Sequence, residues 1–187
     1  MKQIIPFAHD LLSQSVTKGS VVVDATLGNG HDSLFLSRIV GEHGNVYSFD
    51  VQQEAIDQSY KLFNEQGIHN VTSILTGHEN AKDQLTKRGI HEIDGCIFNL
   101  GFLPGSDHSV TTSSYTTIEA INQIFSLLKP ERYIVIVVYP GHEEGRIEKE
   151  KLITFLKSFP AKRADIAQYR MVNRSDKAPF VVALYKK

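Results

Sequence analysis

A turn with two glycines follows an apolar run near the start of the chain. The run, residues 21–23, is β-branched throughout and ends at Asp24, as expected for a buried strand. Gly28 and Gly30 allow a tight turn and the close approach of a ligand, and Asp32 is expected to begin a helix. A strand, a glycine turn and a helix in this order are typical of α/β proteins that bind a nucleoside-like cofactor.

Polar residues after the next two predicted strands extend this cofactor site. Asp50 ends the apolar run 46–49, about 20 residues beyond the glycines, where α/β sites bind ribose hydroxyls. Gln52 lies within reach of the same edge. His78 and Glu79 follow the third predicted strand, where adenine should lie. Either could contact the amino edge of adenine, or could simply begin a helix.

The residues around the second glycine indicate which cofactor the turn would bind. Ser33 stands where a dinucleotide-binding turn has a third Gly or Ala. Asp32 beside it would repel a pyrophosphate, which normally binds at the N-terminus of this helix. A carboxylate suits a ligand without phosphates that carries an amino group or a sulfonium. The sequence therefore favours S-adenosylmethionine over NAD, and a helix-capping role for Asp32 is compatible with either.

The end of the fourth predicted strand could hold an amine for methyl transfer. Asn99 is followed three residues later by the aromatic Phe102. The Asn99 side-chain oxygen and a backbone carbonyl could accept the amine hydrogens, and Phe102 could form a flat wall for a base. A neutral amide does this without stabilising the unreactive ammonium, as a carboxylate would. A plain strand-to-helix turn is the alternative. Candidate proton acceptors nearby are Asp107, His108, His31 and His142.

Apolar periodicity predicts how these residues are positioned. Helices are expected over residues 4–12, 32–40, 52–66, 79–87, 116–128 and 145–158, the fifth beginning at a capping box, Thr116 to Glu119. Strands are expected over residues 21–24, 46–49, 71–75, 93–100, 133–139, 164–171 and 179–185. The last two have no helix between them, so they should pair antiparallel.

This order of elements predicts an α/β fold with an open, mostly parallel, doubly wound sheet of seven strands and a C-terminal antiparallel strand pair. Ligands bind beyond the carboxyl ends of the strands in such sheets. The polar or glycine-rich stretches fall at those ends: residues 24–32, 50–52, 77–80, 99–108 and 139–143.

Composition narrows the class of protein. The 187 residues suggest one domain, 1–187, and the 41% hydrophobic content is that of a soluble globular protein. No signal peptide or membrane span is recognised, and the lone Cys96, expected to be a buried spectator, fits a reducing cytoplasm. The net charge of −1 means that a nucleic acid would need a local basic patch, for which a solvated face is the alternative. The candidates are Lys162, Arg163, Arg170, Arg174, Lys177, Lys186 and Lys187.

Several motifs together resemble one family. The segments DATLGNGHDSLFL, FDVQ, TGHEN and NLGFLPGSD are similar to those of the bacterial YtqB family, described first as rRNA methylases and now as MnmM-type tRNA methyltransferases. The resemblance covers nearly the whole chain, from Ala8 to Phe180. The glycine turn alone is common to all class I methyltransferases, whereas the combination is specific.

The resemblance implies a Rossmann-like class I fold that uses S-adenosylmethionine. It also implies N-methylation of the aminomethyl group on wobble 5-aminomethyl(-2-thio)uridine in the tRNA anticodon arm. The cofactor motifs fall on Asp24, Gly28, Asn29, Gly30, Asp32, Asp50, Gln52, His78, Glu79 and Asn99. The substrate side falls on Leu103, Pro104, Gly105, Asp107, Tyr139, His142 and Arg174, with Phe102 and Ser106-Asp107-His108 where the family pattern has Tyr and a Gly-Asp-Lys-like stretch.

These observations predict direct in-line methyl transfer, with Asn99 and Phe102 at the reacting centre and with no covalent intermediate or metal. The alternatives are methylation of an exocyclic base amine in rRNA, an NAD(P)-dependent oxidoreductase, and a tRNA-binding module without catalysis. A homodimer is a further hypothesis, since two subunits of a small near-neutral domain could span an anticodon arm.

Overall fold

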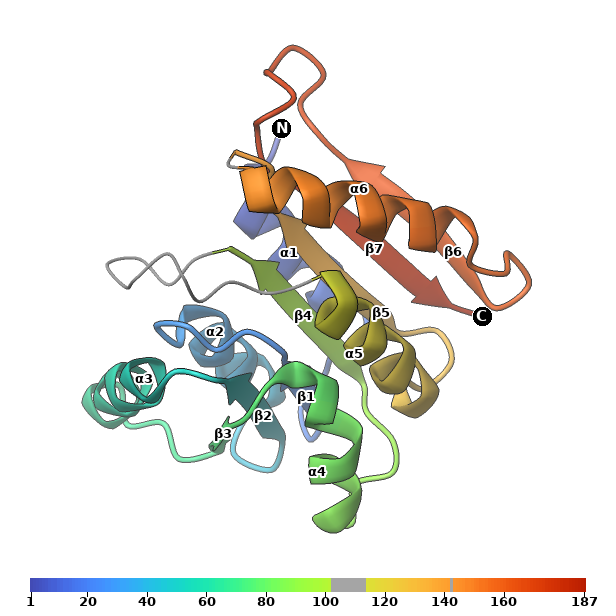
Figure 1. The fold of residues 1–187 in the computed structure, drawn as a ribbon. Helices are drawn as coiled ribbons and strands as arrows, with labels where there is room; N and C mark the ends of the chain where they lie inside the picture. The colour runs from blue at the N-terminus through green and yellow to red at the C-terminus, as the bar shows by residue number, and fades with distance from the viewer. Residues whose placement is uncertain (102–113, 142) are drawn as a thin grey trace.

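A single twisted sheet forms the centre of the computed structural model, which describes residues 1–101, 114–141 and 143–187 (Figure 1). Its strand order is β3-β2-β1-β4-β5-β7-β6. The strands are β1 (Val21–Asp24), β2 (Asn45–Asp50), β3 (Val71–Leu75), β4 (Gly95–Leu100), β5 (Tyr133–Val138), β6 (Ala164–Tyr169) and β7 (Phe180–Lys186). The helices are α1 (Ile4–Ser13), α2 (His31–Val40), α3 (Gln53–Glu65), the 3₁₀ turn η1 (His78–Asn80), α4 (Ala81–Lys87), α5 (Ser114–Leu127) and α6 (Glu143–Lys157).

The direction of the strands confirms the predicted class. Strands β1 to β5 pair in parallel, whereas β7 pairs antiparallel with both β5 and β6. The carboxyl ends of β1 to β6 therefore share one edge of the sheet, and the polar stretches of the sequence meet there. We call this edge the carboxyl edge.

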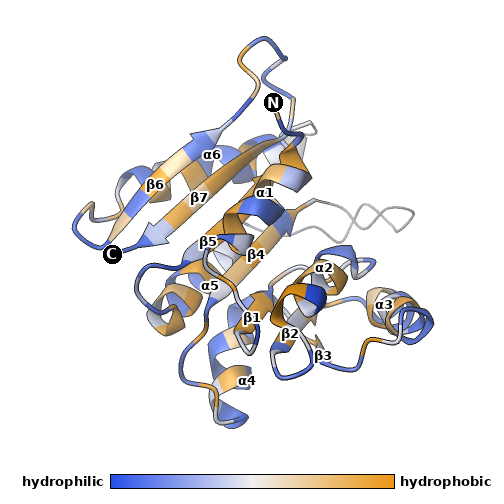
Figure 2. Cartoon of the chain, turned by 180° about the vertical axis from the view of Figure 1, so that it is seen from behind, coloured by the Kyte–Doolittle hydropathy of each residue, from blue (hydrophilic) through white to orange (hydrophobic). Residues whose placement is uncertain are grey.

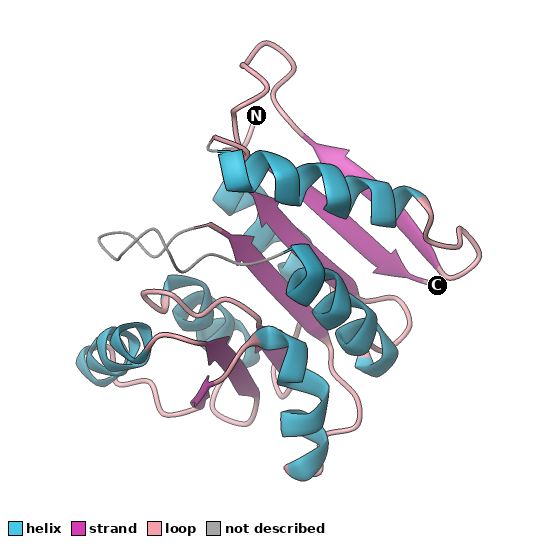
Figure 3. Cartoon of the chain, viewed as in Figure 1, coloured by secondary structure: helices cyan, strands magenta, loops and turns pink. Residues whose placement is uncertain are grey.

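Helices cover both faces of the sheet (Figure 3). On one face, Ala8 and Leu12 of α1 and Leu36 of α2 join a buried cluster with Val22 and Val135. On the other face, the residues of α4, α5 and α6 pack in a second buried cluster around Phe49, Phe98 and Ile136. Figure 2 shows apolar residues concentrated in the central strands between these layers. The sheet is buried on both sides, which explains why β5 is apolar at every position.

Two expected caps at helix N-termini are absent from the described structure. The fifth helix begins at Ser114, so the Thr116–Glu119 pattern lies inside it and is no capping box. Within the helix, the Thr117 hydroxyl donates to Glu148 of α6 at 2.9 Å, and the Glu119 carboxylate accepts from Gln123. Helix α2 begins at His31, and its N-cap residue is Gly30 with no side-chain cap, so Asp32 does not cap it.

Candidate functional site

The glycine turn after β1 needs its glycines for local geometric reasons. Gly28 and Gly30 have φ of 49° and 84°, in the left-handed region that favours glycine. A Cβ on Gly30 would lie 2.9 Å from the Ser59 Cβ and 3.0 Å from the Phe63 ring. At Gly30 the closely approaching group is therefore helix α3 of the protein itself, whereas the sequence pattern suggested a ligand.

Asp50, at the end of β2, holds this turn in place. Its carboxylate accepts the Gly28 N–H at 2.9 Å and the Gln52 N–H at 3.0 Å, one on each oxygen. Each carboxylate oxygen has a second lone pair, so Asp50 retains the capacity to accept two hydroxyls. Gln52 takes part here through its backbone.

Asp24 is fully buried beneath the turn. It accepts the Ser33 hydroxyl at 2.6 Å and the Thr26 N–H at 3.1 Å, and Ser33 is 2.7 Å from Ser48. Ser33, which occupies the position of a dinucleotide-site glycine, thus serves as a donor to Asp24. Burial and then the negative charge of Asp32 raise the pKa of Asp24 from 3.8 to about 7. The hydrogen bonds from Ser33 and Thr26 therefore do not offset the cost of burying the Asp24 charge near Asp32.

Asp32 and Asn99 are joined directly. The Asn99 Nδ2 donates to one carboxylate oxygen of Asp32 at 3.0 Å, and the Asn99 backbone N–H donates to the Thr26 hydroxyl at 2.7 Å. The other Asp32 oxygen lies 2.7 Å from Nε2 of His9, a residue of α1. Burial and then the negative charge of Asp32 raise the pKa of the hydroxyl of Tyr139, which follows β5.

His9 belongs to this cluster, although the sequence analysis did not single it out. Its contact with Asp32 spans 23 positions, which no short motif records. The available signal is its place next to Ala8 in the amphipathic helix α1, on the flank of the apolar face. A histidine there is positioned to reach a neighbouring element.

His78 and Asn29 present polar atoms without partners. His78 is 6% exposed, and its Nδ1 lies 3.1 Å from the Ala25 carbonyl oxygen, so Nδ1 carries the hydrogen. Burial lowers the pKa of His78, which leaves the ring neutral with Nε2 as an acceptor. That Nε2 and the buried Asn29 Oδ1 have no hydrogen-bond partner in the described part of the chain. Unpaired buried acceptors of this kind fit a ligand that brings N–H or O–H donors. The Glu79 carboxylate lies next to Gly77, where it would contact a Cβ at that position.

Most residues expected on the substrate side fall outside the described structure. They are Phe102, Leu103, Pro104, Gly105, Asp107, His108 and His142. Of the others, Tyr139 lies at the carboxyl edge as described above. Arg174 is exposed in the loop between β6 and β7, beyond the same edge. His31 is exposed at the start of α2.

The basic residues near the C-terminus do not form one patch. Arg170, Arg174 and Lys177 lie in the loop at the carboxyl edge, and Arg170 pairs with Asp176. Lys162, Arg163, Lys186 and Lys187 lie at the opposite edge. There Lys186 donates to the carbonyls of Phe125 and Leu128, and Arg163 lies over the Phe125 ring, so both serve the fold. Cys96 is fully buried, as expected of a spectator.

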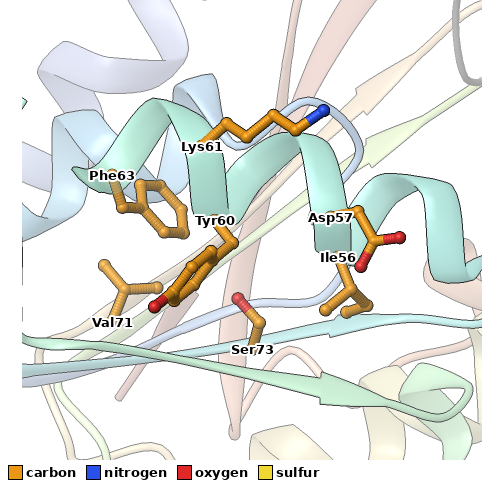
Figure 4. Close-up of a pocket in the computed structure, with 7 residues that line it drawn as sticks. All are labelled: Ile56, Asp57, Tyr60, Lys61, Phe63, Val71 and Ser73. Atoms are coloured by element: carbon orange, nitrogen blue, oxygen red, sulfur yellow. The ribbon is translucent and has the colours of Figure 1, made fainter. Parts of the chain in front are cut away.

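A pocket of about 450 Å³ lies elsewhere, between α3 and β3 (Figure 4). It is lined by Ile56, Asp57, Tyr60, Lys61, Phe63, Val71 and Ser73, and it contains none of the expected site residues. Across the described ranges, no helix combines the length and the apolar character that a membrane crossing requires.

The carboxyl edge thus holds three neighbouring carboxylates, Asp24, Asp32 and Asp50, together with unpaired acceptors on Asn29 and His78. A cationic ligand would reduce the repulsion among the carboxylates, and hydroxyl or amino groups would satisfy the acceptors. S-adenosylmethionine has these properties: a sulfonium, an amino group, ribose hydroxyls and an adenine amine. The residues present fit that cofactor.

Comparisons with known proteins show which family the chain resembles. The family model described as "Putative rRNA methylase" matches residues 46–185. A protein of Arabidopsis thaliana named "tRNA (mnm(5)s(2)U34)-methyltransferase, chloroplastic" is 32% identical over 203 aligned residues, covering 100% of this chain and 70% of the relative.

Solved structures give the same assignment. A putative rRNA methylase from Clostridium thermocellum superposes with a TM-score of 0.94 at 36% identity, covering 100% of this chain and 99% of the other. A putative methyltransferase from Streptococcus mutans, in complex with SAH, has a TM-score of 0.88 at 34% identity, covering 100% and 99% of the two chains. These matches confirm the resemblance on which the sequence analysis relied. The chain therefore belongs to this rRNA methylase family and is a class I, S-adenosylmethionine-dependent methyltransferase.

Proposed function

We propose that the protein methylates the aminomethyl nitrogen of wobble 5-aminomethyl(-2-thio)uridine in tRNA, giving the methylaminomethyl derivative. The observation that carries this proposal is the carboxamide of Asn99 at the end of β4, with its nitrogen bound to Asp32. The Asn99 oxygen is left to accept a hydrogen from an amine. The name of the Arabidopsis relative, at 32% identity, supports this choice of substrate.

The cofactor supplies a methyl carbon attached to a positively charged sulfur. We assign Asp50 and Gln52 to its ribose edge, and Asp32 and Asp24 to its positive charges. His78 and Glu79 are assigned to adenine. Gly28, Asn29 and Gly30 shape the turn between them. These assignments follow from the free acceptors and carboxylates at the carboxyl edge.

The part of Asn99 is to orient the amine. Its side-chain oxygen accepts one amine hydrogen, which directs the nitrogen lone pair away from Asn99 and toward the methyl group. Because Asn99 is neutral, it does not favour the protonated amine, which has no lone pair for attack. Tyr139 and the exposed Arg174 border the same edge and are assigned to the RNA side, with the segment from Phe102 to Asp107.

A second candidate is an exocyclic amine of rRNA, which the description of the matching family favours. The same carboxamide could orient such an amine. The experiment that separates the two uses purified protein, S-adenosylmethionine with a labelled methyl group, and either hypomodified tRNA or rRNA from cells that lack the gene. We expect methylaminomethyluridine in the tRNA digest by mass spectrometry. Label only in a methylated base of rRNA would contradict the proposal.

A further inference from the structure

Helix α1 contributes a side chain to the site from well outside the glycine turn. His9 stacks on Phe35 of α2, with ring centroids 3.7 Å apart and planes inclined by 7°. Its Nε2 lies 2.7 Å from Asp32 Oδ1, and the two side chains are only 20% and 9% exposed. Helix α1 itself is anchored in the core by Ala8 and Leu12. The position of the imidazole is therefore fixed on two sides.

This contact leaves the Asp32 carboxylate engaged at both oxygens. A carboxylate accepts hydrogen bonds and donates none, so His9 Nε2–H donates to Oδ1 and Asn99 Nδ2–H donates to Oδ2. The N-cap residue of α2 is Gly30, so Asp32 lies within the first turn of its helix. His9 of α1 and Asn99 of β4 thus each hold one oxygen of this carboxylate.

The orientation of Asn99 depends on this arrangement. A carboxamide has a donor end and an acceptor end of nearly the same shape, and only its neighbours decide which end faces a ligand. Asp32 selects the orientation with the nitrogen inward. If Asp32 could turn about its side-chain bonds, the amide could reverse and present N–H groups to an amine that itself needs acceptors.

We propose that His9 is a positioning residue for methyl transfer, which acts through Asp32 to keep the Asn99 oxygen directed at the substrate amine. The inference rests on the proposed function, since it assigns Asn99 the part of orienting the nucleophile. Three elements, α1, α2 and β4, then meet at one hydrogen-bonded chain, His9–Asp32–Asn99.

The test compares two substitutions at one position. His9→Gln keeps a donor near the position of Nε2, whereas His9→Leu keeps apolar volume against Phe35 and removes the donor. His43→Leu, at an exposed position, controls for loss of a histidine as such. We expect kcat on hypomodified tRNA to fall roughly 10- to 100-fold in His9→Leu. In the same variant, the KM for RNA and the Kd for S-adenosylhomocysteine should stay within about threefold of native. His9→Gln should restore kcat to within about fivefold of native.

A second readout does not depend on activity. In protein labelled with ¹⁵N-asparagine, the Asn99 side-chain signals are identified by their loss in Asn99→Ala. Their hydrogen exchange with solvent should quicken at least ~10-fold in His9→Leu and stay native-like in His9→Gln and His43→Leu.

Unchanged Asn99 exchange in His9→Leu overturns the inference, and so does a native kcat in that variant. Equal losses of kcat in His9→Gln and His9→Leu, with equal falls in Tm, also overturn it, because they indicate a purely structural histidine. If the native protein methylates none of the RNAs, the proposed function fails, and the exchange measurement still decides whether His9 orients Asn99.

Discussion

At the scale of single residues, the role proposed for Asn99 is the most specific one, and substitution of Asn99 tests it directly. Asn99→Ala deletes the acceptor for the amine and leaves the Asp32 carboxylate with His9 alone. We expect kcat to fall about 100-fold or more, as for loss of a group that orients the reacting atoms. The Kd for S-adenosylhomocysteine by calorimetry should change by less than about threefold. Asn122→Ala, at an exposed position of α5, is the matched control. A native kcat in Asn99→Ala would remove Asn99 from the reacting centre.

Asp24, assigned above to the cofactor site, lowers the stability of the folded protein because its carboxylate is buried. Its pKa is about 7 in the folded protein and about 3.8 when unfolded. Between these values the folded state binds more protons than the unfolded state, so stability falls as pH rises from about 4 to 7 and stays low above 7. The loss is on the order of 4 kcal/mol.

Asp24→Asn removes this titration and keeps the shape of the side chain. We predict that Tm of the variant exceeds that of native at pH 8 and equals it more nearly at pH 5, measured by thermal unfolding across that range. Its affinity for S-adenosylmethionine should fall, because one negative charge of the pocket is gone. An identical dependence of Tm on pH in the two proteins would show that Asp24 is not the titrating group.

At the scale of elements, the turn between β1 and α2 is shaped as much by α3 as by any ligand. Gly30→Ala combines a positive φ with a Cβ 2.9 Å from the Ser59 Cβ. Gly19 has the same φ of 84°, and a Cβ there meets nothing within 4 Å. Gly19→Ala therefore measures the backbone strain alone, about 1–2 kcal/mol.

We expect Gly30→Ala to lower the free energy of unfolding by that amount plus roughly 1–3 kcal/mol for the crowding against α3. Chemical denaturation of both variants measures the two free energies. Cofactor affinity should fall in Gly30→Ala only, because α2 must shift to relieve the contact. Equal free energies of unfolding in the two variants would mean that α3 moves aside freely.

The same elements show what sequence reasoning can and cannot supply. Alternating and helical apolar patterns predicted the seven strands and the helices because burial against the sheet imposes those periods. The predicted start of the fifth helix is wrong because the helix begins two residues earlier, at Ser114, which places Thr116 and Glu119 inside it. Asp50, Asp24 and Asn99 were found because each ends a strand at the carboxyl edge. His9 was missed because its partner is remote in sequence, and its place on the flank of the apolar face of α1 does not by itself indicate that partner.

At the scale of the whole molecule, the basic residues near the C-terminus lie at two opposite edges of the sheet. The loop between β6 and β7 projects beyond the carboxyl edge, beside the N-terminus, as Figure 1 shows. It holds Arg170, Arg174 and Lys177, all exposed. Gly141, after β5, packs near the backbone of Lys177, so this loop adjoins the site. With a net charge of −1, the protein has no general attraction for RNA.

Charge reversal at the two edges should therefore have unequal effects. We predict that Arg174→Glu weakens binding of tRNA about 5- to 20-fold at 50 mM salt. The plot of the logarithm of the association constant against the logarithm of salt concentration should become less steep by about 1 to 2. Lys162→Glu makes the same charge change at an exposed position of the opposite edge and should leave both quantities near native. Filter binding or fluorescence anisotropy across a salt series gives the two slopes. Similar slopes for Arg174→Glu and Lys162→Glu would indicate a diffuse electrostatic effect, and tRNA would then have to approach by another face.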